Sequence, residues 1–197
     1  MTAPPKALRR PLAVAVTGGI GAGKSEALRA FASHGAATLS SDEVVHRLIA
    51  EDEEVRSALQ ERFGTTDRTE IAAIVFEDRD ELTWLEALLH PRARAAYSTW
   101  YAGLAEADEP PGLAVVEIPL LYETGSEGRF DAVVAVTAPE AVRSARSSVR
   151  PDARGKRLLP DEEKIRRASF AYVNDGSLEQ LDAFVADVVR ALTAVAA

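Results

Sequence analysis

The sequence predicts an α/β fold, a parallel five-stranded sheet flanked by helices. Three observations support this prediction: short apolar segments alternate with helical patterns, a glycine cluster directly follows the first apolar segment, and the stretch from 51 to about 103 is mostly helical. Strands buried on both faces are continuous apolar runs, and their alternation with helices is typical of a parallel sheet. The length of 197 residues suits one soluble domain of ordinary size.

The first part of the chain predicts two strands and two helices. Residues 12–17 predict a short buried strand, and good helix formers follow from Ser25 to about Ser33, with Gly35 as a plausible stop. Residues 37–39 predict a second short strand. The Ser-Ser-Asp sequence at 40–42 offers N-cap residues to a helix with apolar positions at 44, 45, 48 and 49.

A long helical block separates the second strand from the third. It is too long for an ordinary crossover connection, so we expect a helical insertion over about 51–105. We expect Pro91 to interrupt this block, because proline lacks an amide hydrogen and restricts His90 before it.

The last part of the chain predicts three more strands, at 113–118, 132–137 and 170–173, and helices at 140–149 and from 178 to the end. Between Arg143 and Arg167 there are nine basic and four acidic residues. We therefore expect one domain over 1–197, with a helical insertion at about 51–105 and a basic lid at about 143–167.

Composition excludes several classes of function. With 31 acidic and 23 basic residues, the net charge of −8 argues against nucleic-acid or membrane binding by the whole surface. The absence of cysteine excludes zinc ribbons, iron–sulfur clusters and thiol nucleophiles. No apolar run approaches the roughly 20 residues of a membrane helix, and the first one is too short for a signal peptide. We expect a cytoplasmic protein.

Residues 18–25, Gly-Gly-Ile-Gly-Ala-Gly-Lys-Ser, match the G-x-x-x-x-G-K-[ST] pattern between a strand and a helix. Glycines let backbone amides converge on phosphate oxygens, and the helix presents its positive N-terminus to the same anion. The pattern predicts a P-loop NTPase-type site in which Lys24 reaches the β- and γ-phosphates and Ser25 ligates Mg²⁺. The predicted nucleotide contacts are Gly18, Gly19, Gly21, Ala22, Gly23, Lys24, Ser25 and Glu26.

Other polar residues have two interpretations each. Asp42 follows the second strand, where its carboxylate can accept a proton from an acceptor hydroxyl or simply cap a helix. Arg146 and Arg150 are four residues apart and suit a transferring phosphoryl group, or belong to a solvated basic face. Glu117 can hold Mg²⁺ through water or lie at a sheet edge, and His90 can have a functional role or be a structural hydrogen-bonding group.

Five motifs in the right order resemble those of the dephospho-CoA kinase family over about residues 12–181. They are the loop at 16–25, Ser-Asp at 41–42, Leu-Leu-His-Pro at 88–91, Pro-Leu-Leu-Tyr-Glu at 119–123 and Asn-Asp-Gly-Ser at 174–177. The resemblance implies an ATP- and Mg²⁺-dependent transfer of phosphate to the ribose 3′-hydroxyl of dephospho-CoA, giving CoA and ADP in the final step of coenzyme A biosynthesis. It also implies a P-loop kinase core with a helical acceptor-binding insertion and a lid, and dephospho-CoA as the small-molecule substrate. We expect no nucleic-acid, membrane or obligatory protein partner.

The resemblance also implies roles for single residues. Lys24 and the loop hold ATP, Asp42 is the general base, and Arg146 and Arg150 are lid arginines. Asn174 lies near the adenine of ATP. The acceptor side consists of Asp42, His90, Pro119, Leu120, Leu121 and Glu123.

Two residues depart from the family pattern, and the sequence leaves three other functions open. Ser40 stands where the family usually has an acid, and Leu158 where a glutamine is common. The alternatives are another nucleoside or nucleotide kinase, a GTP-binding switch, and a catalytically idle CoA- or nucleotide-binding regulatory protein. The sequence contains no Asn-Lys-x-Asp guanine signature, which argues against the switch.

Overall fold

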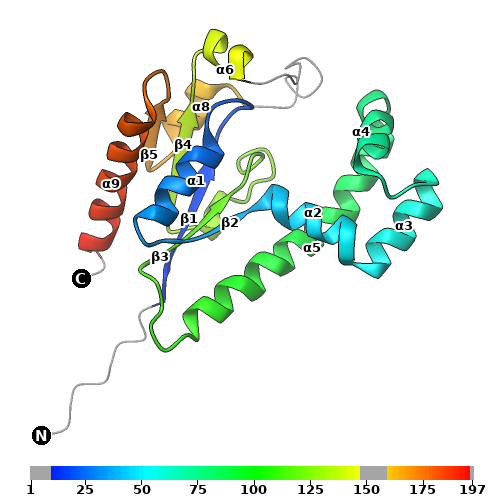
Figure 1. Ribbon diagram of the computed structural model, residues 1–197, viewed down its shortest axis with the longest axis horizontal. Coiled ribbons are helices and arrows are strands. Elements are labelled where there is room, and N and C mark those ends of the chain that lie inside the picture. Colours follow the sequence, from blue (N-terminus) through cyan, green and yellow to red (C-terminus); the bar gives the residue numbers. More distant parts are fainter. Residues whose placement is uncertain (1–9, 147–158, 196–197) are drawn as a thin grey trace, which may run out of the picture. The chain divides into compact units, whose positions relative to one another are not determined.

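The computed structural model describes residues 10–146 and 159–195 (Figure 1). Its centre is a sheet of five parallel strands in the order β2-β3-β1-β4-β5. The strands are β1 (Leu12–Thr17), β2 (Ala37–Ser40), β3 (Leu113–Glu117), β4 (Ala132–Thr137) and β5 (Phe170–Val173). The predicted α/β fold with a five-stranded parallel sheet is confirmed.

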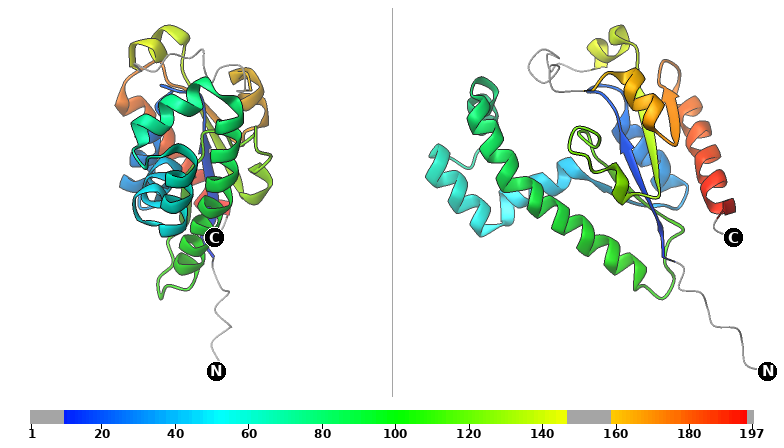
Figure 2. Two further views of the ribbon diagram at one scale, coloured as in Figure 1. Left: turned by 90° about the vertical axis from the view of Figure 1, so that its right-hand side faces the viewer. Right: turned by 180° about the vertical axis from the view of Figure 1, so that it is seen from behind.

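Helices cover one face of this sheet. They are α1 (Lys24–Ser33) and α9 (Leu178–Val195), and the left view of Figure 2 shows both on the same side of the strands. Val14 and Val16 of β1 point into this layer, where Phe31 of α1 and Val185 of α9 are fully buried. Burying apolar side chains of this size stabilises the fold by roughly 1.5–3 kcal/mol each.

The opposite face is covered by the segment that follows β3 and by a short helix, α8 (Asp161–Arg167), seen across the sheet from α1 in Figure 2. The segment after β3 includes a 3₁₀ turn, η1 (Glu127–Arg129). Ala15 and Val133 point to this face and are buried with Leu121 and Tyr122. The central strands are therefore buried on both sides, which explains their continuous apolar sequences. A further short helix, α6 (Glu140–Arg146), follows β4.

A second compact unit, Ser41–Trp100, is helical, while Met1–Ser40 and Tyr101–Ala197 make up the first. Its helices are α2 (Ser41–Glu51), α3 (Glu53–Phe63), α4 (Arg68–Glu77) and α5 (Arg79–Ala105), the last of which runs on past the unit. Asp52 and Asp67 cap α3 and α4 by accepting hydrogen bonds from backbone amides of the first turn. Val55, Leu59 and Ile71 form the centre of its small core. The predicted acceptor-binding role of this region stays a prediction.

The expectation that Pro91 interrupts the helical block is wrong, because Pro91 lies inside α5, which is unbroken over its 27 residues. Proline removes one backbone hydrogen bond, at a cost of roughly 3 kcal/mol in a helix interior. The remaining turns hold the helix: Leu89 and Ala93 on either side of Pro91 are buried, and Arg92 Nη1 donates to the Leu88 carbonyl at 3.1 Å. Within the described ranges, no helix is long and apolar enough to span a membrane.

Candidate active site

The glycine-rich loop follows β1 and passes close over the end of β4. A Cβ atom on Gly18 would lie 1.8 Å from the Val136 carbonyl oxygen, so any side chain there would displace the loop from the sheet. Inside the loop, the Ala22 amide donates to the Gly19 carbonyl at 3.3 Å. A compact glycine turn that leads into a helix N-terminus is the backbone arrangement that binds phosphate groups. The glycines of the predicted loop therefore lie in one turn of the kind that binds phosphate groups, and their contact with a nucleotide stays a prediction.

Lys24 begins α1 and lies back against the loop. Its Nζ donates to the Gly19 carbonyl oxygen at 3.0 Å and lies 4.0 Å from Oε1 of Glu117. The two side chains are only 10% and 4% exposed, so this charge pair is largely shielded from water. The ammonium group is held beside the loop, where the β- and γ-phosphates of a bound nucleotide need a positive charge.

Ser25 and Glu26, the next two residues of α1, have different surroundings. Ser25 is exposed, so its hydroxyl is open to a metal ion. Glu26 forms an ion pair with Arg29, one turn later on the surface of the helix, at 2.7 Å. This is an ordinary helix-surface pair. The predicted nucleotide contact of Glu26 stays a prediction.

Glu117 ends β3, an interior strand. In register it lies beside Val16 of β1 and Ser40 of β2, and it is 3% exposed. The alternative that it is a sheet-edge carboxylate is wrong, because β3 has a neighbour on each side. Its buried carboxylate lies at the carboxyl ends of the strands, where ligands collect in open α/β sheets.

Asn174, directly after β5, reaches the glycine-rich loop. Its Nδ2 donates to the Ala22 carbonyl oxygen at 2.9 Å, and the residue is 3% exposed. Arg146, the last residue of α6, donates from Nη1 to the Asn174 carbonyl at 3.3 Å. The structure thus brings Asn174 and Arg146 to the loop. Arg150 and Leu158 lie outside the described residues.

The helical unit contains Asp42 and His90. Asp42 is the exposed second residue of α2, so it does not occupy the N-cap position. Burial raises the pKa of the Tyr97 phenol, a hydrogen bond with Ser41 opposes the rise, and the charge of Asp42 adds to it. Ser41, Asp42 and Tyr97 therefore lie close together within this unit. His90 is half-buried on α5.

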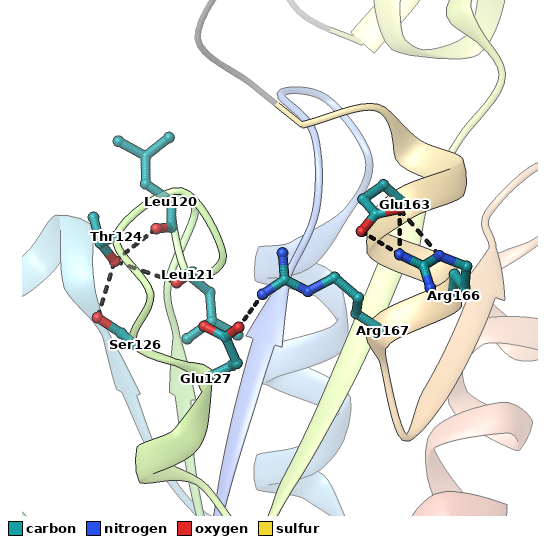
Figure 3. Close-up of polar contacts among 8 residues, drawn as sticks. All are labelled: Leu120, Leu121, Thr124, Ser126, Glu127, Glu163, Arg166 and Arg167. Atoms are coloured by element: carbon teal, nitrogen blue, oxygen red, sulfur yellow. Dashed lines mark hydrogen bonds and ion pairs between the residues drawn. The ribbon is translucent and has the colours of Figure 1, made fainter.

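The predicted acceptor segment after β3 folds into a tight turn. Thr124 Oγ1 donates to the carbonyls of Leu120 and Leu121, at 2.9 and 3.2 Å (Figure 3). Leu121 is fully buried, and its side chain packs in the core rather than facing a substrate. Pro119 and Leu120 are half-buried, and Figure 3 shows the Leu120 side chain directed away from that of Leu121.

Glu123 binds the segment that leads into α8. Its Oε1 accepts a hydrogen bond from the Leu159 amide at 2.9 Å and lies 3.1 Å from Nζ of Lys164, whose side chain is completely buried. Beside this pair, Arg167 forms an ion pair with Glu127 (Figure 3). Its guanidinium also lies over the Tyr122 ring, 4.4 Å from the ring centroid.

Sequence reasoning missed the structural role of Lys164 and Arg167. It assigned both to a basic lid, because they fall within the segment from Arg143 to Arg167, in which basic residues outnumber acidic ones. No signal in the sequence marks Lys164 as buried, since its partner Glu123 is distant in the chain.

Comparison with known proteins agrees with this geometry. The dephospho-CoA kinase family model matches residues 12–180. The dephospho-CoA kinase of Rhodopseudomonas palustris (strain BisB18) is 37% identical over 189 residues, which cover 89% of this chain and 93% of that protein. A crystal structure from Thermus thermophilus, 34% identical, superposes with a TM-score of 0.73 and covers 93% of this chain and 98% of its own. The dephospho-CoA kinase of Campylobacter jejuni, 23% identical, shares the fold with a TM-score of 0.66 over 92% of this chain and 96% of its own. The chain belongs to the dephospho-CoA kinase family.

Proposed function

We propose that this chain transfers the γ-phosphoryl group of ATP to the ribose 3′-hydroxyl of dephospho-CoA, giving CoA and ADP in the final step of coenzyme A biosynthesis. The observation that carries the proposal is the phosphate loop, with Lys24 3.0 Å from a loop carbonyl and beside the buried Glu117, in a chain of this family. Family membership makes the chain an ATP-dependent kinase. Dephospho-CoA, the substrate in the relatives' names, is the proposed acceptor.

Catalysis of phosphoryl transfer consists mainly of positioning and charge stabilisation. We assign the β- and γ-phosphates to the loop amides and Lys24. We assign charge stabilisation on the transferring group to Arg146 and Arg150. Arg146 contacts Asn174, which itself contacts the loop, and this supports the assignment of Arg146. For Arg150, which lies outside the described residues, the support is its correspondence by sequence position to a lid arginine of the family.

The oxygen donors at the loop fit Mg²⁺. This hard cation prefers oxygen ligands, and it usually takes one or two from the protein and others from substrate phosphates. We assign the exposed hydroxyl of Ser25 as a direct ligand and the Glu117 carboxylate as a contact through water. When bound, the ion neutralises charge on the phosphate oxygens.

Asp42 is the proposed general base. It accepts the proton of the 3′-hydroxyl while that oxygen bonds to the γ-phosphorus, and the bond from the γ-phosphorus to the bridging oxygen of ADP breaks. Its exposed carboxylate, two residues after β2 ends, supports the assignment.

Among the predicted acceptor-side residues, His90, Pro119 and Leu120 are retained as contacts. Leu121 and Glu123 hold the shape of their segment, because the first is in the core and the second is paired with Lys164. We assign the reaction to the cytoplasm, with no obligatory protein partner. We also expect no nucleic-acid or membrane partner, and the net charge of −8 supports this last expectation.

The test is mass-spectrometric analysis of products after incubation of the pure chain with ATP, Mg²⁺ and dephospho-CoA, beside nucleosides and pantetheine compounds. We expect CoA and ADP in equal amounts, and no phosphorylated product from the other acceptors. Phosphorylation of a different acceptor would contradict the substrate and keep the kinase chemistry. No transfer to any acceptor would favour a catalytically idle binding protein.

A further inference from the structure

Asn174 is a buried residue whose polar groups are engaged on three sides. Its backbone amide donates to the Thr137 carbonyl at 2.7 Å, and its backbone carbonyl accepts from Arg146 Nη1 at 3.3 Å. Its side-chain Nδ2 donates to the Ala22 carbonyl at 2.9 Å. The backbone hydrogen bond holds the residue at the end of β4, so its side chain can hold the loop in a fixed position.

The hydrogen bond to Ala22 fixes the orientation of one peptide unit of the loop. In a planar trans peptide, the carbonyl oxygen and the amide hydrogen of the next residue point in opposite directions. Because Asn174 holds the Ala22 oxygen, the Gly23 amide hydrogen points away from Asn174. A rotated peptide would aim an oxygen at the nucleotide, and an oxygen repels phosphate where an amide hydrogen attracts it.

Gly23 and Asn174 also fit each other sterically. Gly23 has a φ of 98°, and a Cβ atom there would lie 2.2 Å from Asn174 Nδ2. The carboxamide therefore occupies the space that a side chain at 23 would need, and it packs directly on the loop backbone. The contact between Asn174 and the loop therefore depends on the conformation of the loop backbone.

The alternative role, contact with the adenine base, needs an accessible carboxamide. Asn174 is 3% exposed, and its amide nitrogen is already bound to Ala22. A residue that acts on the loop affects every triphosphate equally, whereas a residue that contacts the base distinguishes one base from another.

We propose that Asn174 is a positioning residue of the phosphate loop, which orients the peptide between Ala22 and Gly23 so that the Gly23 amide faces the nucleotide phosphates, whatever base the nucleotide carries. This inference deepens the proposed function, because it takes the loop to be the ATP site. It does not depend on the identity of the acceptor.

The test uses the full chain with Asn174→Asp and Asn174→Ala. The first puts a carboxylate oxygen against the Ala22 carbonyl, and the second removes the donor. Calorimetric titrations at fixed Mg²⁺ concentration measure Kd for inorganic tripolyphosphate, ATP and GTP. We expect both variants to weaken all three by the same factor, about tenfold or more, which is the size of one lost buried hydrogen bond. The ratio of Kd for ATP to Kd for GTP stays unchanged.

Asp175→Asn is the matched control. It makes the reverse change of Asn174→Asp, removing a carboxylate charge from an exposed neighbouring residue. If simple repulsion of the anionic nucleotide explained the aspartate variant, this control would tighten binding by a similar factor and Asn174→Ala would have no effect. Thermal unfolding of each variant without nucleotide checks that the fold is intact.

Two results would overturn the inference: weaker ATP binding with unchanged tripolyphosphate binding, which indicates a base contact, or unchanged binding of all three ligands. Failure of the proposed function is separate, since a chain that does not phosphorylate dephospho-CoA can still show the loss of tripolyphosphate binding.

Discussion

Glu123 and Lys164 form an ion pair away from solvent, with Oε1 3.1 Å from Nζ and no exposed surface on the lysine side chain. The same carboxylate oxygen accepts the Leu159 amide at 2.9 Å. The segment after β3 is thereby tied to the start of α8. A charge withdrawn from water is tolerated only while its counter-charge is present, so each member of this pair depends on the other.

Removing only the charge of Glu123 should destabilise the fold strongly. Glu123→Gln keeps an oxygen acceptor for Leu159 but leaves the Lys164 ammonium buried without a counter-charge, at an expected cost of about 3–5 kcal/mol in the free energy of unfolding. Lys164→Met is the second single variant. In the double variant, Glu123→Gln with Lys164→Met, the loss in the free energy of unfolding should be much smaller than the sum of the losses in the two single variants. Urea unfolding measures all three.

The surface pair Glu163 and Arg166, in the same helix, provides the control. Glu163→Gln removes an exposed ion pair and should leave the unfolding midpoint nearly unchanged. Strictly additive effects of the two buried changes would contradict the coupling.

Lys24 should be required for phosphoryl transfer. Lys24→Met removes the positive charge beside the loop, and we expect kcat with ATP to fall by at least about 100-fold. Arg29→Met changes a 70%-exposed cation of the same helix and should keep kcat within about twofold. A coupled assay for ADP measures both, and near-normal turnover of the lysine variant would remove the loop from the mechanism.

Asp42 should affect turnover much more than ATP binding. Asp42→Asn deletes a proton acceptor without touching a phosphate contact, so we expect kcat to fall by about 10²–10⁴-fold while Kd for ATP stays constant. Glu43→Gln, the exposed neighbour, is the matched control. Equal losses in kcat and in ATP affinity would give Asp42 a structural role instead.

Asp131 should contribute to stability in a pH-dependent way. Two hydrogen bonds from Arg10, at 2.7 and 2.8 Å, and one from the Ala13 amide hold the pKa of Asp131 below its ordinary value despite partial burial. Because the folded pKa is the lower one, the stabilisation is fully present above the unfolded pKa of about 3.9. It is lost as the pH falls through the folded pKa.

Thermal unfolding of wild type and Asp131→Asn between about pH 7 and pH 2 tests this expectation. The difference in unfolding temperature between them should be constant at neutral pH and shrink in acid. The exposed Asp108→Asn should follow wild type at every pH. A difference that stayed constant down to the lowest pH would contradict the lowered pKa.

The strands and the phosphate loop were predictable because their signals are local. The expected strands at 12–17 and 132–137 match β1 and β4, and those at 37–39 and 113–118 differ from β2 and β3 by one residue at one end. Continuous apolar runs indicate burial on both faces whatever the neighbours are. The glycine spacing and the four other motifs also sufficed for the family, which the family model confirms.

The remaining features depend on partners far away in the sequence. Lys164 is completely buried while the adjacent Ile165 is 36% exposed, the reverse of what their chemistry suggests, and only the position of Glu123 explains it. The link from Asn174 to Ala22 spans most of the chain. The course of α5 through Pro91 likewise depends on tertiary packing at Leu89 and Ala93, which overrides the local preference.

The strand order has a consequence for synthesis on the ribosome. β1 and β2 are made first, but they do not pair with each other, because β3 lies between them in the sheet. Leu12 of β1 pairs with Leu113 of β3, which is synthesised about a hundred residues later. At roughly 5–20 residues per second, β1 waits about 5–20 s for its first neighbour. The helices at 41–100 emerge complete during that interval. The nascent chain must therefore keep an apolar strand from aggregating until the middle of the sheet arrives.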